Sequence, residues 1–259
     1  MQPVGSSLAM AQVSAQGGRS SAHGKAVELF THSLCPYAQR VEMALAEKQV
    51  QHEVVPIDLN RKPSWYRSVN PRMLVPALRW NGNVVVESLA ICRFVDESFE
   101  GPPLMPDEAG LRDRAEELLD TCDVVVSAGL QAVKGKDGRY WGIGTKFDER
   151  DIESLERNLA PLLDQLQELG GPYLLGQQLT LADLAYLPFI ERFAVAMDQF
   201  MGYSLRMLGN GRLGEWMDSC QTRHSLQGTW TNPVKLRKAY QKYMSLDFFD
   251  YHSLTRSDL

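Results

Sequence analysis

The chain has 259 residues, of which 44% are hydrophobic and 23% are charged, a composition typical of globular proteins with one or two domains. Its formal net charge of -5 gives no net positive field that would attract nucleic-acid phosphates or anionic lipids. Charged residues interrupt every apolar stretch before it reaches the roughly 18 residues that a membrane-spanning helix needs. We therefore expect a soluble protein with neither a nucleic-acid partner nor a membrane partner.

The 4 cysteines are scattered along the chain without a C-x-x-C pair, which argues against a disulfide framework and favours a reducing compartment. No histidine falls in a metal-ligand pattern, so no metal is expected. Residues 1–24 are rich in Ser, Ala, Gly and Gln and contain no Asp or Glu. This composition is typical of a disordered tail or of a transit peptide, so the expected location is cytoplasmic or, in the second case, plastid.

Residues 25–101 are expected to fold as one α/β unit, because strand-like and helix-like patterns alternate there. Val27–Thr31 alternates apolar and polar side chains as a half-buried strand does, and a helix follows from Pro36. The other expected elements are a strand at residues 53–57, a short helix at 64–69, strands at 75–80 and 84–86, and a helix at 87–99. An Asn-Gly pair at Asn81–Asn83 predicts a tight hairpin between the last two strands.

Strand patterns stop at Gly101–Pro106, which breaks regular structure, so we expect a linker at residues 102–110. Apolar residues three and four positions apart then predict an all-helical domain over residues 111–228. Its helices are expected at residues 111–133, 149–169, 181–197 and 213–223. Thr180 and Asp183 have the spacing of a capping box. The tail, residues 229–259, is expected to contain one amphipathic helix whose role the sequence does not assign.

Cys35 is the residue most suited to chemistry, because it lies between the first strand and the helix that Pro36 begins. Unpaired N–H groups and the positive end of a helix dipole stabilise a thiolate, and such sites lower a cysteine pKa from about 8.5 to roughly 3.5–7.5. Arg40, about one turn further on, either adds positive potential or is a solvated surface charge. The sequence predicts a reactive thiolate at Cys35, and the alternative is an inert buried thiol.

Cys35 has no second cysteine three positions further on, where a dithiol oxidoreductase would have its resolving thiol; that position is Ala38. An external thiol must then resolve a mixed disulfide formed at Cys35. Glutathione is the small abundant thiol of a reducing compartment. The sequence thus predicts a glutathione site close to Cys35.

Several motifs together resemble a cysteine-type glutathione transferase, most like the plant-type lambda class, with the omega class next. These motifs are Cys35–Arg40, Pro56–Tyr66, Leu74–Leu78, Glu87–Leu89, Leu175–Gln177, Leu181–Asp183 and Ala185–Phe193. The resemblance implies a thioredoxin-like N-terminal domain that binds glutathione, followed by the all-helical C-terminal domain of this family. It leaves open whether the protein is a monomer or a dimer.

The resemblance also implies roles for individual residues of the glutathione site. Cys35 would be catalytic, with Pro36 and Tyr37 as supporting residues. Val75, before a cis proline at Pro76, would pair its backbone with the cysteinyl part of glutathione. The remaining contacts would come from Glu87 to the γ-glutamyl amine, Ser88 to the adjacent carboxylate and Lys62 to the glycine carboxylate. Without the resemblance, we would interpret Lys62 as a solvated surface charge and Glu87–Ser88 as an ordinary helix cap.

The activity that the resemblance implies is glutathione-dependent thiol transfer and reductive deglutathionylation. Glutathione would be the co-substrate, and small-molecule or protein mixed disulfides would be the partners. The resemblance also suggests dehydroascorbate reduction. Two alternatives are a glutathione-conjugating transferase and a non-catalytic carrier of flavonoid-like ligands. For the carrier, the aromatic residues Tyr140, Trp141 and Trp216 either line a second-substrate cleft or pack in the core and loops.

Three further residues have simpler interpretations. Cys92 and Cys122 lie among apolar residues of helical segments and are expected to be core residues. His32 precedes Cys35 by three positions and either tunes the thiol or belongs to the loop.

Overall fold

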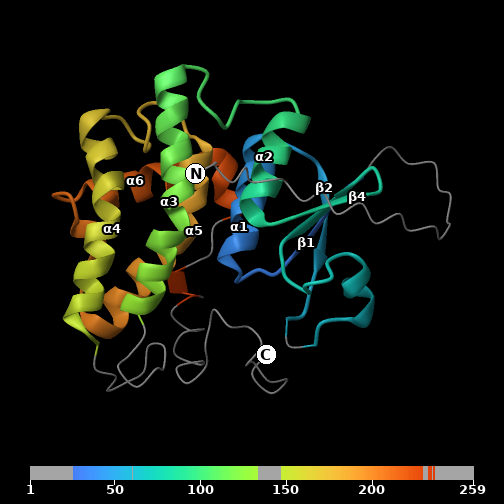
Figure 1. Cartoon of the computed structure of the whole chain (residues 1–259), viewed down its shortest axis with the longest axis horizontal. Coiled ribbons are helices and arrows are strands. Elements are labelled where there is room, and N and C mark those ends of the chain that lie inside the picture. Colours follow the sequence, from blue (N-terminus) through green and yellow to red (C-terminus); the bar gives the residue numbers. More distant parts are fainter. Residues whose placement is uncertain (1–25, 60, 134–146, 230–232, 235, 237–259) are drawn as a thin grey trace, which may run out of the picture.

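The computed structural model describes residues 26–59, 61–133, 147–229, 233–234 and 236. A four-stranded sheet lies at one side of the molecule, and helices α1 and α2 separate it from the helices α3, α4, α5 and α6 (Figure 1). The expectations for residues 1–24, for Tyr140 and Trp141, and for most of the tail at 229–259 lie outside the described residues. No helix within the described ranges has both the length and the apolar character needed to cross a bilayer.

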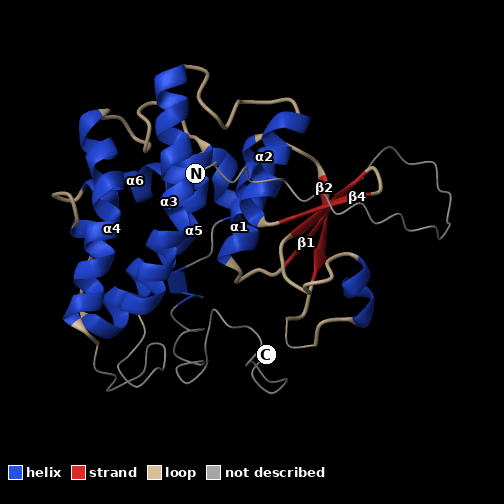
Figure 2. Cartoon of the chain, in the orientation of Figure 1, coloured by secondary structure: helices blue, strands red, loops and turns tan. Residues whose placement is uncertain are grey.

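The N-terminal half follows the predicted order of strands and helices. Its elements are β1 (Val27–Thr31), α1 (Pro36–Glu47), β2 (His52–Pro56), the 3-10 helix η1 (Ser64–Ser68), β3 (Ala77–Trp80), β4 (Asn83–Val86) and α2 (Ser88–Ser98). The strand order is β2-β1-β3-β4, with β1 parallel to β2 and antiparallel to β3 (Figure 2). The predicted strand at 75–80 begins two residues later, at Ala77, because Pro76 has no N–H to donate to a ladder.

Both faces of the sheet are covered, as the side-chain alternation of β1 requires. Val27 and Leu29 belong to the large core cluster, which also contains buried residues of α1 and α2. Phe30 belongs to a second cluster, where it packs near Tyr66 of η1, with ring centroids 5.7 Å apart. The loop after β1, which carries Cys35, is therefore fixed between a buried strand and a buried helix.

The second half is helical, as predicted. It comprises α3 (Ala109–Ala132), α4 (Glu149–Glu168), α5 (Leu181–Met201), η2 (Leu205–Met207), α6 (Arg212–Thr222) and η3 (His224–Thr229). α3 begins two residues before the predicted start, inside the predicted linker, because the Glu108 carboxylate caps the amides of Gly110 and Leu111. α5 continues past residue 197 to Met201 and ends at Gly202, whose φ of 63° lies in the left-handed region.

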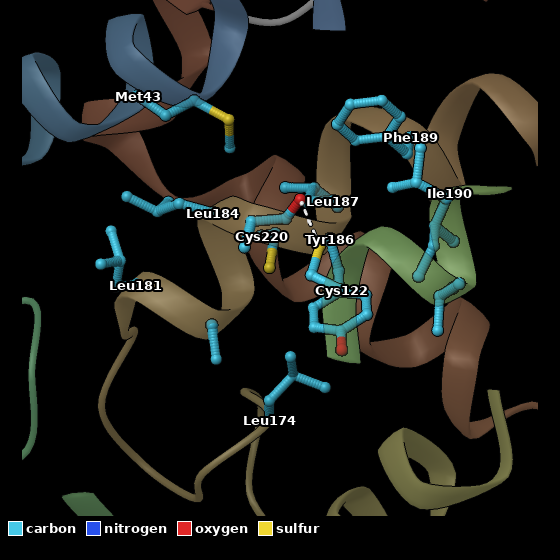
Figure 3. Packing of buried hydrophobic residues seen from close by; sticks show 14 of the residues in the cluster. Met43, Cys122, Leu174, Leu181, Leu184, Tyr186, Leu187, Phe189, Ile190 and Cys220 are labelled. Carbon is cyan, nitrogen blue, oxygen red and sulfur yellow. Dashed lines mark hydrogen bonds between the residues drawn. The ribbon is translucent and has the colours of Figure 1, made fainter. Parts of the chain in front are cut away.

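The central helix of this domain is α5, which is buried along most of its length and packs against α3 and α1. Figure 3 shows its side chains, among them Leu184 and Leu187, between Met43 of α1 and Cys122 of α3. A surface helix would have one apolar stripe; burial on all sides explains why this sequence is apolar around its circumference. α5 thereby joins the two halves of the molecule.

The predicted capping box at the start of α5 is confirmed. The buried carboxylate of Asp183 accepts hydrogen bonds from the backbone N–H groups of Thr180 and Leu174, at 2.7 and 2.9 Å. It also accepts one from the indole Nε1 of Trp216, at 2.8 Å. Trp216 is fully buried, so it is a core residue and does not line a cleft.

Candidate functional site

Cys35 is the residue before the first turn of α1, and its backbone has extended geometry with φ -76° and ψ 116°. Its carbonyl accepts the hydrogen bond from Gln39 N at 3.0 Å, which starts the helix, and Pro36 supplies the first helical position. Its Sγ lies 3.9 Å from the carbonyl oxygen of Val75, forming a weak contact in which the thiol donates. The sequence placed this thiol correctly at the helix start.

The prediction that Cys35 has a lowered pKa is wrong. Burial raises the pKa of the thiol to about 11, because the ionised sulfur would be cut off from solvent. The backbone N–H groups of Ala38 and Tyr37 lower this pKa, as the helix-terminus argument requires, and the charge of Arg192 acts in the same direction. These contributions are smaller than the desolvation cost, which sequence position alone does not reveal.

A cavity of about 600 Å³ opens beside Cys35 and brings nearly all of the sequence-predicted site residues together. The predicted residues that line it are Cys35, Tyr37, Lys62, Val75, Pro76, Glu87 and Ser88. Pro36, which is buried at the start of α1, is absent from this lining. The volume falls in the range of about 300–1,000 Å³ usual for small-molecule sites.

Val75 and Pro76 form the cavity wall next to the thiol. The peptide bond between them is cis, as the resemblance implied. Val75 precedes β3, whose first residue, Ala77, pairs with Phe30 of β1. The sheet therefore fixes the wall that carries the Val75 backbone relative to Cys35.

Glu87 and Ser88 lie where β4 passes into α2. Glu87 is the N-cap residue and has a φ of 69°, a value that residues other than Gly rarely adopt. Its carboxylate forms an ion pair with Arg72 at 2.5 Å in an exposed position. Ser88 is buried at the first position of α2, where the helix has backbone N–H groups without partners inside the helix. The N-terminus of a helix and a carboxylate are thus adjacent.

Two buried arginines are functional candidates that the sequence analysis did not place in the site. Arg40 lines the cavity and donates to the hydroxyl of Ser88 at 3.1 Å, so the surface alternative for this residue is wrong. Arg192 of α5 donates to the carbonyl of Leu34, directly before Cys35, at 3.1 Å. Both depend on the packing of α5 against α1, and short sequence motifs contain no signal of that contact.

One wall of the cavity comes from the helical domain, also beyond the sequence-predicted set. It consists of Asp123, Val126, Ser127 and Leu130, all from α3. Their three- and four-residue spacing places them on one helix face, a signal that could have been read once α3 was known to flank the site. Asp123 supplies the charge on this wall.

The remaining expectations concern residues around the site. Cys92 and Cys122 are buried core residues, as expected. His32 belongs to the loop, where its carbonyl accepts from the N–H of Cys35 at 2.9 Å and its Nδ1 accepts from the N–H of Leu34 at 3.3 Å. Burial lowers the pKa of His32, while the charge of Asp58 acts in the opposite direction.

Comparison with known proteins identifies both halves of the chain. Residues 34–98 match the family model "Glutathione S-transferase, N-terminal domain", and residues 147–219 match "Glutathione S-transferase, C-terminal domain". Glutathione S-transferase L1 of Arabidopsis thaliana is 34% identical, covering 83% of this chain and 86% of the relative. The rat protein glutathione S-transferase omega-1 is 25% identical, over 85% of each chain.

A solved structure gives the same result for the fold. Rice GST1 in complex with glutathione is 24% identical and has a TM-score of 0.69, covering 86% of this chain and 99% of that chain. The thioredoxin-like domain and the all-helical domain expected from the sequence are confirmed, as is the greater resemblance to the lambda class than to the omega class. The chain belongs to the glutathione S-transferase family.

Proposed function

We propose that the protein binds glutathione in the cavity beside Cys35 and exchanges its thiol with glutathione mixed disulfides. The observation that carries this proposal is the position of Cys35, whose sulfur is the one that lines the cavity among the described residues. Cys92, Cys122 and Cys220 are also buried thiols, but they do not border this cavity. A glutathionyl group bound there can therefore reach one cysteine.

The cavity offers complementary groups for each end of the tripeptide. The backbone of Val75 would pair with the cysteinyl residue, as a strand edge pairs with an extended peptide. Glu87 would hold the γ-glutamyl amine, and Ser88, at the N-terminus of α2, the adjacent carboxylate. Lys62 would hold the glycine carboxylate. This orientation would place the sulfur of glutathione next to Cys35.

The proposed reaction has two exchange steps. In the first, the Cys35 thiolate attacks the glutathionyl sulfur of a mixed disulfide, so a Cys35–glutathione disulfide forms and the partner leaves as a thiol. In the second, a glutathione thiolate attacks the glutathionyl sulfur on Cys35, which gives oxidised glutathione and regenerates the Cys35 thiol. Each cycle consumes one reduced glutathione: the S–S bond of the mixed disulfide breaks, and the S–S bond of oxidised glutathione forms. Dehydroascorbate reduction at this site would consume two reduced glutathione molecules, which together supply two electrons and two protons and leave as oxidised glutathione. Removal of glutathione from a small aromatic conjugate would consume one, and the aromatic carbon that loses the sulfur would take up a proton.

The raised pKa of Cys35 favours a second candidate function, glutathione conjugation, over attack by a Cys35 thiolate. Burial raises that pKa to about 11, so the thiol is protonated at neutral pH. A protonated thiol can donate a hydrogen bond to the thiolate of bound glutathione, which would then attack an electrophile directly. In this case Cys35 would stabilise the nucleophile without forming a disulfide.

The substitution Cys35→Ser separates these two functions, because a serine hydroxyl donates a hydrogen bond but cannot form a disulfide. We expect the variant to lose turnover of the mixed disulfide of glutathione and mercaptoethanol, while conjugation to an electrophilic aromatic chloride persists or rises. Cys92→Ser is a matched control, since Cys92 is buried away from the cavity. Full mixed-disulfide turnover by Cys35→Ser would refute the thiol-transfer proposal.

A further inference from the structure

Arg40 is a buried cation in the wall of the cavity. Arg40 is 1% exposed, and it lines the cavity from α1 beside Ser88. A guanidinium stays protonated under all conditions relevant to a folded protein. Taking such a charge out of water is costly unless hydrogen bonds and an opposite charge compensate it.

The hydrogen-bond partners of Arg40 are all neutral. Its Nε donates to the carbonyl oxygen of Ala185 at 2.8 Å, and its Nη1 donates to the Ser88 hydroxyl at 3.1 Å. Its Nη2 lies 3.0 Å from Sγ of Cys122, whose pKa burial raises to about 11, so that this thiol is uncharged at neutral pH.

Aromatic rings complete the surroundings of the guanidinium. The ring centroid of Phe189 lies 4.5 Å from its central carbon, and that of Tyr37 lies 5.3 Å away. Among the residues that the structure describes, no carboxylate forms an ion pair with Arg40. Each nitrogen of the Arg40 guanidinium thus has a hydrogen-bond partner, but no carboxylate among the described residues pairs with its charge.

The group that joins Arg40 to the cavity is the hydroxyl of Ser88. That hydroxyl accepts a hydrogen bond from Arg40, so its own hydrogen is available to a further acceptor. Ser88 is also the first residue of α2, an 11-residue helix whose N-terminal amides and dipole attract anions. A guanidinium and a helix N-terminus therefore act on the same point in the cavity, and both favour negative charge.

We infer that the α-carboxylate of the γ-glutamyl group is the counter-ion of Arg40, which acts on it through Ser88 as a positioning residue. This inference rests on the proposed function, because it assumes that glutathione binds in this cavity. The carboxylate and the amine of the γ-glutamyl group share one carbon atom. The adjacent residues Ser88 and Glu87 match these two groups, since Ser88 would bind the carboxylate and Glu87 the amine. Arg40 donates to Ser88 and so adds positive charge on the carboxylate side.

A comparison of two peptides tests the role of Arg40. Reduced glutathione and γ-aminobutyryl-cysteinylglycine differ in the α-carboxylate alone, and calorimetry under reducing conditions gives the affinity of each. We expect the wild-type protein to bind glutathione about tenfold or more tightly than the analogue, as is usual for a hydrogen bond to a charged group. In Arg40→Gln this ratio should fall to about twofold or less, and Arg40→Lys should restore part of it.

The matched control is Lys48→Gln, which removes another buried cation at the C-terminal end of α1, where it pairs with Asp96 at 2.9 Å outside this cavity. Because it does not touch Ser88, we expect its peptide ratio to equal that of the wild-type protein. Equal loss of affinity for both peptides in Arg40→Gln would show a merely structural role and overturn the inference. Binding of neither peptide by the wild-type protein would instead refute the glutathione site itself, and the inference with it.

Discussion

The sulfur of Cys35 and the carbonyl oxygen of Val75 lie 3.9 Å apart, although 40 positions separate them in the chain. Strand pairing of β1 with β3 brings their two loops together at the same end of the sheet. The contact shields the thiol and presents an acceptor, both of which favour S–H over S⁻. It therefore connects the fold to the pH dependence of the proposed chemistry.

Alkylation of Cys35 should become faster as the pH rises. Its pKa is raised to about 11, so each unit of pH below that value lowers the thiolate fraction tenfold. We expect the rate with iodoacetamide, followed by mass spectrometry of the Cys35 peptide, to rise about tenfold per pH unit from pH 7 to 10. A rate that is already constant above pH 6 would show that the helix-terminus effect outweighs burial.

Glu47 and Arg223 should stabilise the contact between the two halves of the molecule. The Glu47 carboxylate accepts from Nε of Arg223 at 2.9 Å and from the hydroxyl of Ser225. Glu47→Gln should lower the free energy of unfolding by about 1–3 kcal/mol at pH 7, less than for a fully buried pair because Arg223 is partly exposed. Urea titration measures this loss.

The effect of Glu47→Gln should shrink in acid. Burial raises the pKa of Glu47, but the hydrogen bonds from Arg223 and Ser225 outweigh burial and lower it below the ordinary value of 4.5. The carboxylate thus stabilises the fold above that value, and the contribution disappears as the pH falls through the lowered pKa. Glu153→Gln, at the exposed pair with Arg157, is the control and should cost about 0.5 kcal/mol or less. Equal costs for both variants would contradict this assignment.

Glu191 should have the opposite pH dependence. Burial in α5 raises its pKa to about 7, although the charge of Arg192 acts to lower it. The folded state then retains a proton that the unfolded state releases near 4.5, so stability falls as the pH rises between these values.

Substitution by glutamine removes this cost. We expect Glu191→Gln to be about 1–3 kcal/mol more stable than wild type at pH 8 and equally stable at pH 4. Thermal or urea unfolding at the two pH values measures the difference, with Glu117→Gln at an exposed position of α3 as control. Lower stability of Glu191→Gln at pH 8 would mean that the ionised carboxylate is stabilising.

Asp123 should make the proposed reaction favour positively charged mixed disulfides over negatively charged ones. It places a carboxylate on the α3 wall of the cavity that Cys35 lines. We expect Asp123→Asn to lower, by about fivefold, the ratio of kcat/KM for the mixed disulfide with cysteamine to that with mercaptopropionate. Asp120→Asn, on the same helix but outside the cavity lining, should leave this ratio unchanged. An unchanged ratio in Asp123→Asn would place the leaving thiol away from α3.

Local sequence patterns were sufficient to predict most of the fold. The alternation at Val27–Thr31 and the Pro36 start placed Cys35 between β1 and α1, and the Asn81–Asn83 turn joined β3 to β4. These features depend on neighbouring residues, so they can be read from short segments. The gathering of Lys62 and Glu87 around one cavity followed from the family resemblance.

Long-range packing determined the features of the site that the sequence could not predict. Burial of the Cys35 thiol depends on several segments that meet around it, and its pKa therefore differs from the one expected for a helix start. Arg40 could not be assigned from α1 alone, because its partners Ala185 and Cys122 come from α5 and α3. The α3 wall with Asp123 likewise belongs to a helix that sequence motifs did not link to the site.

Disulfide formation at Cys35 is the step on which the proposed thiol transfer depends. Incubation with oxidised glutathione followed by intact-mass measurement should show one glutathionyl group on the wild-type protein. Excess reduced glutathione should remove that group, and Cys35→Ala should never acquire it. A glutathionyl group that persists in Cys35→Ala, or a wild-type protein that remains unmodified at any pH up to the thiol's pKa, would contradict the assignment of Cys35 as the reacting sulfur.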